Sequence, residues 1–238
     1  MNVILVFLAA IGAIIIWWLA GQRLTSKPWL ETGSVQLPAH DGVDRQQSPA
    51  PAVKIGLFVF LGVVGAVFSL AVSAYFMRAA SADWWATPVP RLLWVNTAAL
   101  ALSSAALQWA YLAARRDDMG NVIIGLCAGG ASAVTFLIGQ LLAWQQLRAA
   151  GYFVASNPAN SFFYMITAAH GLHLMGGLVA LGRTTAKVWR GAEMAQVRLS
   201  VELCTIYWHF LLLVWLVLLG LLTGWTDDFV DICRRLLN

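Results

Sequence analysis

Long runs of apolar residues, separated by shorter polar stretches, dominate the chain. A helix crosses the hydrocarbon core of a bilayer with about 20 residues, at a rise of about 1.5 Å per residue. In these runs the apolar positions are continuous and do not alternate with polar ones, which favours helices over a β-barrel. The pattern therefore predicts an all-α integral membrane bundle with six transmembrane helices. The six runs cover residues 2–20, 54–77, 92–114, 122–143, 161–182 and 201–225.

The polar stretches indicate how the chain is divided. Residues 21–53 form its one sizeable polar stretch and are rich in Pro, Gly, Ser and Gln, as is typical of a surface linker. We expect an N-terminal transmembrane helix at 1–20, this linker at 21–53, a five-helix domain at 54–225 and a short tail at 226–238. We interpret the first run as a retained helix, because it lacks a preceding basic segment and is longer than the apolar part of a signal peptide, about 7–15 residues.

Composition agrees with a membrane protein and argues against several kinds of site. Of the 238 residues, 60% are apolar and 11% are charged, whereas soluble domains carry about 25% charged residues. The cysteines, Cys127, Cys204 and Cys233, lie far apart without a CxxC pair, so we expect neither a disulfide framework nor a structural metal site. We find no Walker loop, Rossmann glycine pattern or HExxH motif, and expect no catalytic residue in this chain.

Positive charges are distributed unevenly between the two sides of the membrane. With six spans, ten Lys and Arg residues fall on the side of the segments 21–54, 115–116 and 183–198, and five fall on the other side. Lys and Arg concentrate on the cytoplasmic side of membrane proteins. In a bacterial inner membrane this places the linker in the cytoplasm and both termini in the periplasm.

Small residues recur along the second apolar run, at Gly56, Gly62, Gly65, Ser69 and Ser73. In membrane helices, small side chains at near-helical spacing let the backbone of a neighbouring helix approach closely. We therefore expect this helix to pack closely against another one.

Four ionisable side chains lie within the last two runs: His170, His173, Glu202 and His209. A charged or strongly polar group at membrane depth costs at least a few kcal/mol, so it usually faces the interior of a bundle and finds a partner there. From the helical rise, His173 and His209 come to nearly the same depth in a core about 30 Å thick, and we expect them to face each other. We expect all four side chains to be buried between the last two helices.

Three interpretations of these polar groups remain open. They hydrogen-bond between helices and fix the packing, a role that Asn96 and Gln140 would share. Alternatively, they handle protons or pair with lipid headgroups, because His and Glu titrate or pair near neutral pH. In the third interpretation, His173 and His209 are axial ligands of a haem, since they are the pair at a common depth.

Several strings of residues resemble subunit III of the haem-copper oxidases, the cytochrome c oxidase subunit III family. HGLH at 170–173, GG at 176–177 and YWHF at 207–210 are similar to the family's last core helices. KIGLFVFL at 54–61 and PRLLWVNT at 90–97 are similar to its earlier ones. The strings also follow the family's order along the chain.

This resemblance implies an auxiliary subunit without haem or copper of its own. Such a subunit packs against the catalytic subunit I and other oxidase subunits, which hold the redox centres, and binds phospholipid in a groove between its helices. It supports assembly, stability and proton uptake of the catalytic subunit. In this reading no residue of the chain binds a cofactor or metal, and the polar residues singled out above have structural roles.

Two departures from the family's pattern indicate a divergent member. The family's carboxylate after its KxGMxxFL string is replaced here by Val64, and the Asp after WHFV is missing, since Leu211 and Leu212 follow Phe210. Two alternatives to a cytochrome c oxidase subunit stay open. The chain is a small b-type cytochrome that carries electrons through a haem on His173 and His209, or it is an accessory subunit of a nitric oxide reductase.

Overall fold

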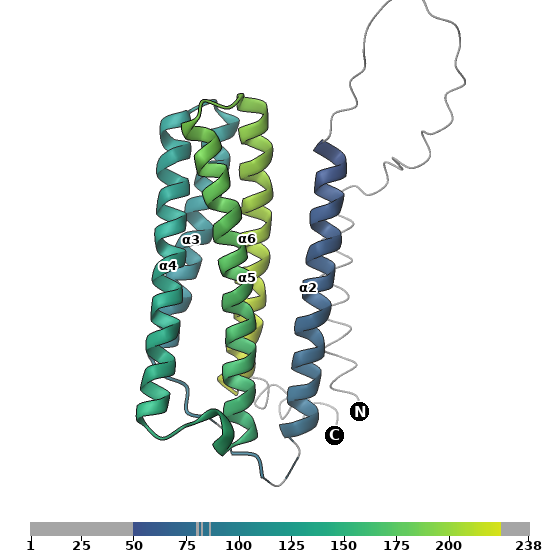
Figure 1. The fold of residues 1–238 in the computed structure, drawn as a ribbon, viewed down its shortest axis with the longest axis vertical. Coiled ribbons are helices and arrows are strands. Elements are labelled where there is room, and N and C mark those ends of the chain that lie inside the picture. The colour runs from purple at the N-terminus through teal and green to yellow at the C-terminus, as the bar shows by residue number, and fades with distance from the viewer. Residues whose placement is uncertain (1–49, 80, 82, 86, 225–238) are drawn as a thin grey trace, which may run out of the picture. The chain divides into compact units, whose positions relative to one another are not determined.

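The structure is a computed structural model that describes residues 50–79, 81, 83–85 and 87–224. The helix predicted within 1–20, most of the linker and the tail at 226–238 lie outside these residues. Regular structure in the described part consists of five long helices and a short 3₁₀ turn, and each long helix is long and apolar enough to cross a membrane (Figure 1). The prediction of an all-α membrane bundle is confirmed for this part. The elements are α2 (Ala50–Ala79), α3 (Leu92–Arg115), α4 (Met119–Ala149), η1 (Val154–Ser156), α5 (Pro158–Trp189) and α6 (Met194–Leu222).

The helices run past the ends of the apolar runs because local signals in the polar turns cap them. The side chain of Asp118 accepts a hydrogen bond from the backbone N–H of Asn121 and caps α4. Asn157 caps α5 in the same way, and Pro158 follows at the first helical position, where its missing N–H costs nothing. Gly151 and Gly191 end α4 and α5 at positive φ, 88° and 71°, which glycine adopts without strain.

Helices α3 and α4 form the closest seam of the bundle. A Cβ atom added at Gly125 of α4 would lie 2.8 Å from the Cβ of Ala110 and 2.9 Å from the carbonyl oxygen of Ala106, both in α3. At Gly129 it would lie 2.9 Å from the side chain of Leu107. Only a hydrogen atom fits at these two positions, so the two backbones approach as closely as small residues permit.

The core of the described part lies between α3, α4, α5 and α6. Trp215 of α6 and Phe136 of α4 are fully buried there, with their ring centroids 4.8 Å apart in an edge-to-face arrangement. Large residues elsewhere in these helices fill the remaining space. The largest fully buried side chains are Trp208, Trp215, Phe136, Phe163, Leu93, Leu100, Leu107, Leu126, Ile166, Leu174, Leu211 and Leu218.

Helix α2 packs against α5 and α6 and stands apart from the other four helices in the view of Figure 1. Its small residues do not make a close seam. Nothing lies within 4 Å of a Cβ added at Gly56 or Gly62, and one at Gly65 would meet the Phe210 ring at 3.7 Å, an ordinary contact. The predicted close approach is therefore wrong for this helix within the described residues. Small residues allow such an approach, but a larger apolar residue such as Phe68, buried on the inner face of α2, sets the actual spacing.

Candidate functional site: polar residues between the helices

His170 lies on α5 and is fully buried. Its Nε2 atom is 3.1 Å from the backbone carbonyl oxygen of Leu211 in α6. A carbonyl oxygen only accepts hydrogen bonds, so Nε2 carries the proton and donates it. The ring also packs against Trp215 and Phe136, with centroid distances of 5.0 and 5.6 Å. This imidazole thus joins α5 to α6 within the aromatic core.

His173 lies almost one turn further along α5 and is partly exposed. Its Nδ1 atom donates to the carbonyl oxygen of Ala169 in its own helix, at 2.8 Å, and its ring lies 5.4 Å from that of Phe68 in α2. Its own backbone carbonyl oxygen accepts a hydrogen bond from the hydroxyl of Tyr207 in α6, at 2.8 Å. The ring therefore faces α2, while the backbone is tied to α6.

His209 is exposed on α6, and its Nδ1 atom lies 3.0 Å from the hydroxyl oxygen of Ser104 in α3. The expectation that it is buried and faces His173 is wrong, because the two rings lie against different helices. Depth along a helix follows from residue spacing, but each residue also turns the side chain by about 100°. Trp208 is fully buried, and the next residue, His209, is therefore turned toward α3 and the outer surface.

Glu202 is partly exposed near the start of α6. Its Oε1 atom lies 2.6 Å from the ammonium nitrogen of Lys54 in α2, and the two side chains are 28% and 36% exposed. The expected burial between α5 and α6 is therefore wrong for this residue as well. Near the end of the helix its carboxylate reaches a cation on α2, so the ion pair joins α2 to α6.

Asn96 of α3 and Gln140 of α4 are buried, with exposures of 3% and 4%. The amide of Asn96 lies against Gly139, where an added Cβ would come within 2.0 Å of its Oδ1 atom. Within the described residues, no hydrogen-bond partner is present for Asn96 Nδ2, for either terminal atom of Gln140, or for His170 Nδ1. The buried polar positions thus cluster in the α3–α4–α5 core rather than between the last two helices alone.

Sequence reasoning missed the polar contacts that aromatic residues make. The indole N–H of Trp215 donates to the hydroxyl of Thr97 in α3, at 2.9 Å, and that of Trp144 donates to Thr167 in α5, at 3.1 Å. Thr97 and Tyr207 both lie inside the strings quoted for the family resemblance. A search for hydrogen-bonding groups within those strings, and not only for ionisable ones, would have found them.

The geometry does not support a haem held by His173 and His209. Two axial ligands must point into one cavity from opposite sides of the macrocycle. Here one ring packs on Phe68 of α2 and the other contacts Ser104 of α3. In addition, no three His, Cys, Asp or Glu side chains converge as metal ligands anywhere in the part of the chain that the structure describes. What these residues do is connect helices.

Comparison with known proteins gives a consistent family assignment. The sequence profile of the family "Cytochrome c oxidase subunit III" matches residues 53–227. Cytochrome c oxidase subunit 3 of Thermostichus vulcanus is 29% identical over 176 residues, which are 71% of this chain and 85% of that protein. Cytochrome bo(3) ubiquinol oxidase subunit 3 of Pseudomonas aeruginosa is 30% identical over 128 residues, 51% of this chain and 58% of its own. Heme-copper oxidase subunit I+III of Aeropyrum pernix is 26% identical over 225 residues, 87% of this chain and 26% of its own.

Proposed function

The chain belongs to the cytochrome c oxidase subunit III family, and from that premise we propose that it supports the assembly and stability of a catalytic subunit. It is a non-catalytic, multi-pass membrane subunit of a haem-copper oxidase, a kind of subunit that associates with subunit I. The redox centres belong to the partner subunits.

One observation carries the supporting role: the residues that resemble the family make contacts between helices. His170 donates to Leu211 O, and Tyr207 donates to the carbonyl oxygen of His173, so two hydrogen bonds join α5 to α6. At Gly177 an added Cβ would come within 2.7 Å of the Tyr207 ring, so this glycine admits the aromatic side chain. These strings therefore serve to hold a rigid helical scaffold on which another membrane subunit can pack.

We further propose that phospholipid lies against α2 and the bundle. The outer face of α2 is apolar and open, with Val63 59%, Val67 52% and Leu70 71% exposed. At the start of α2, the Lys54–Glu202 pair places a cation and a carboxylate near the level of lipid headgroups. Acyl chains along the apolar face, with headgroups near this pair, fit both features.

Proton uptake would be supported through the catalytic subunit rather than by a titrating group on α2. The position where the family carries a carboxylate holds Val64, which is buried with 3% exposure on the inner face of α2. A valine cannot exchange protons. The support would then come from the way this chain holds the neighbouring subunit in place.

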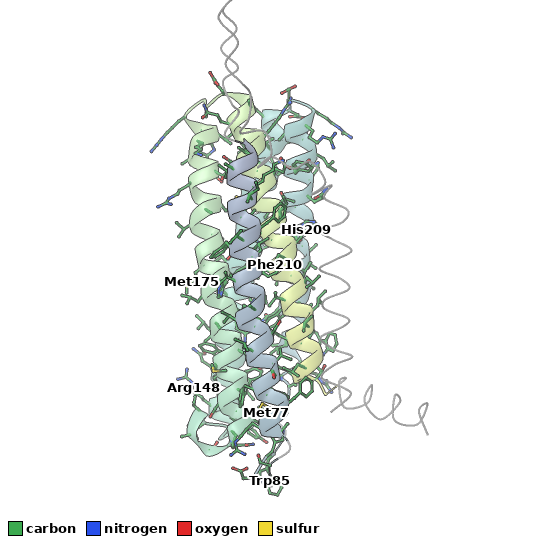
Figure 2. The ribbon with its side chains drawn as sticks, turned by 90° about the vertical axis from the view of Figure 1, so that its right-hand side faces the viewer. Met77, Trp85, Arg148, Met175, His209 and Phe210 are labelled. Carbon is green, nitrogen blue, oxygen red and sulfur yellow. The ribbon has the colours of Figure 1, made fainter. Side chains whose placement is uncertain are left out.

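The described residues favour a cytoplasmic location for one end of the bundle. Figure 2 shows Met77, Trp85 and Arg148 near the same end, which is the end opposite to the α3–α4 and α5–α6 turns. Three Lys and Arg residues lie toward the first end and seven toward the second. We propose that the second end is cytoplasmic in a bacterial inner membrane, and that both termini are periplasmic if residues 2–20 add a sixth span. The three are Arg78, Arg91 and Arg148, and the seven are Lys54, Arg115, Arg116, Arg183, Lys187, Arg190 and Arg198.

Purification of the tagged chain in native lipid discs tests the proposal. We expect mass spectrometry to find subunit I in the same particles and a haem absorbance band that follows subunit I. The isolated chain should show no Soret band, and one would overturn the assignment of the redox centres to partner subunits. Extraction of the particles should yield phospholipid that survives washing with mild detergent. Its complete loss without any change in stability would contradict the lipid proposal.

A further inference from the structure

An imidazole is exposed at the centre of the apolar surface formed by α3 and α6. The midpoint of α6 (Met194–Leu222) is residue 208, and His209 follows it (Figure 2). Its contact, Ser104, is next to the midpoint of α3 (Leu92–Arg115). Both residues therefore lie roughly 20 Å from the ends of their helices. The ring is exposed at this depth.

One nitrogen of the His209 ring, Nε2, has no assigned hydrogen bond to the described residues in this apolar setting. Nδ1 contacts the Ser104 hydroxyl, so Nε2 is the atom that is available to a group outside the chain. A polar group exposed to hydrocarbon is costly, and polar residues in membrane helices usually face a protein partner or a water-filled cavity. Glu202, near the headgroup level, lies seven residues or about 10 Å from His209 along α6. The ring is therefore inside the hydrocarbon core and beyond the hydrogen-bonding reach of a headgroup at that level.

The central part of the N-terminal apolar run does not offer a partner for Nε2. Residues 3–16, the central part of the apolar run nearest the N-terminus, read VILVFLAAIGAIII and contain no hydrogen-bonding side chain. A segment of this composition has no side chain that can hydrogen-bond to an imidazole. A hydrogen-bonding side chain on a membrane helix of another chain would satisfy Nε2.

The surface around the imidazole suits a membrane helix. Ala101 and Ala105 of α3 are exposed and small, so a helix can approach there. Gln108, one turn beyond Ser104 on the same helix, is partly exposed and adds a second hydrogen-bonding group. Apolar residues surround this polar strip, including Leu213 of α6, which is 47% exposed.

We propose that the α3–α6 surface centred on His209 is the docking site for a transmembrane helix of a partner oxidase subunit. That helix presents a hydrogen-bonding side chain to Nε2 inside the hydrocarbon core. The inference rests on the proposed function, because the oxidase complex supplies the partner chain. It adds which surface of this chain makes the contact and which atom gives the contact its specificity.

Photocrosslinking within the intact complex tests the surface. A photoreactive phenylalanine analogue is placed at Leu213, one turn from His209, and a matched control is placed at Ile138 of α4, which is 54% exposed. We expect the first position to crosslink to an oxidase subunit identified by mass spectrometry, and the control to crosslink to lipid or detergent. Equal crosslinking from both positions, products with lipid alone, or a crosslink between two copies of this chain would each overturn the proposal.

Substitution of His209 tests whether Nε2 makes a hydrogen bond to the partner helix. Membrane double-mutant cycles put such hydrogen bonds at a strength that corresponds to roughly a 3- to 15-fold change in affinity. We expect His209→Leu to lower the amount of copurified partner by this factor, and His209→Gln, whose amide still hydrogen-bonds, to restore most of it. Wild-type recovery for His209→Leu would overturn the role of Nε2. If the unmodified chain recovers no oxidase subunit at all, the proposed function itself fails, and the two failures are thereby distinguished.

Discussion

The α3–α4 seam and helix α2 contain similar small residues but use them differently. In α4, a Cβ added at Gly125 would lie 2.8 Å from the side chain of Ala110, and one at Gly139 would lie 2.0 Å from Asn96 Oδ1. In α2, an added Cβ at Gly56 or Gly62 would meet nothing within 4 Å. The comparison teaches that a small-residue pattern shows where a close approach is permitted, and that the facing helix decides whether it takes place.

Polar contacts also differ between the four-helix bundle and helix α2. Inside the bundle they are uncharged and buried, such as the bond from His170 to Leu211 O. Helix α2 is held at one end by the partly exposed pair of Lys54 and Glu202. Buried hydrogen bonds are costly to break, whereas exposed ion pairs contribute little. We therefore expect α2 to be the more easily detached element, and the predictions below test this difference.

The largest effect should come from the aromatic core. Trp215→Ala removes a fully buried side chain and its hydrogen bond to Thr97, so we expect the free energy of unfolding to fall by about 3–5 kcal/mol. Its control is Trp189→Ala at the end of α5, where the indole is 70% exposed, and it should change this quantity by less than about 0.5 kcal/mol. Unfolding titrations in mixed detergent micelles measure both. Similar losses for the two variants would remove the distinction between core and surface tryptophans.

A methyl group added to the α3–α4 seam should have the next largest effect. Gly139→Ala forces the Asn96 amide to move, and overpacking of this kind costs about 1–3 kcal/mol. Gly62→Ala in α2 has open space around it and should be neutral or slightly stabilising. The same titrations apply. Asn96→Ala combined with Gly139→Ala should recover part of the loss, and a double variant as unstable as the sum of the singles would contradict this explanation.

The ion pair between α2 and α6 should have a smaller effect. A double-mutant cycle with Lys54→Met and Glu202→Gln should give a coupling energy of about 0.2–1 kcal/mol, because both side chains are partly exposed. The change should appear as faster hydrogen exchange of α2 amides, with exchange in α3 and α4 unchanged. Uniform acceleration across all five helices would show that α2 is not a separate unit.

Acid should have the smallest effect on stability. It acts on two carboxyl groups, that of Asp83 after α2 and that of Asp118 at the start of α4. The Arg78 guanidinium lowers the pKa of Asp83 to about 2, and the backbone N–H of Asn121 lowers the pKa of Asp118. Because both folded pKa values are depressed, their contributions to stability are present above the ordinary value of about 4 and are lost as the pH falls further. Both groups are exposed, so we expect only a small decrease in melting temperature between about pH 5 and pH 2.

The contributions of Asp83 and Asp118 to stability should differ in their dependence on salt. About 1 M salt should reduce the contribution of Asp83, which depends on an exposed ion pair, and should leave most of that of Asp118, which caps α4 through a backbone hydrogen bond. Asp83→Asn and Asp118→Asn supply the matched variants. Equal salt dependence of the two variants would contradict this assignment of causes.

Much of the fold and the family could be predicted from the sequence, because hydrophobic length is a local property. The five described spans all coincide with predicted apolar runs, and the strings around 170–177 and 207–210 led to the family that the comparison then established. The exact ends were missed because caps such as Asp118 and Asn157 extend the helices into polar turns.

What the sequence by itself determined is the number of described spans, their order and the depth of each polar residue, since these follow from hydrophobic length and a fixed rise per residue. Only the tertiary structure decided which way each side chain faces. His170 turns into the core, His209 turns toward α3 and the surface, and Glu202 pairs with α2. The physical reason is that rotation of a helix about its axis is set by packing against its neighbours, and a uniformly apolar helix gives little periodic signal of which face is inside.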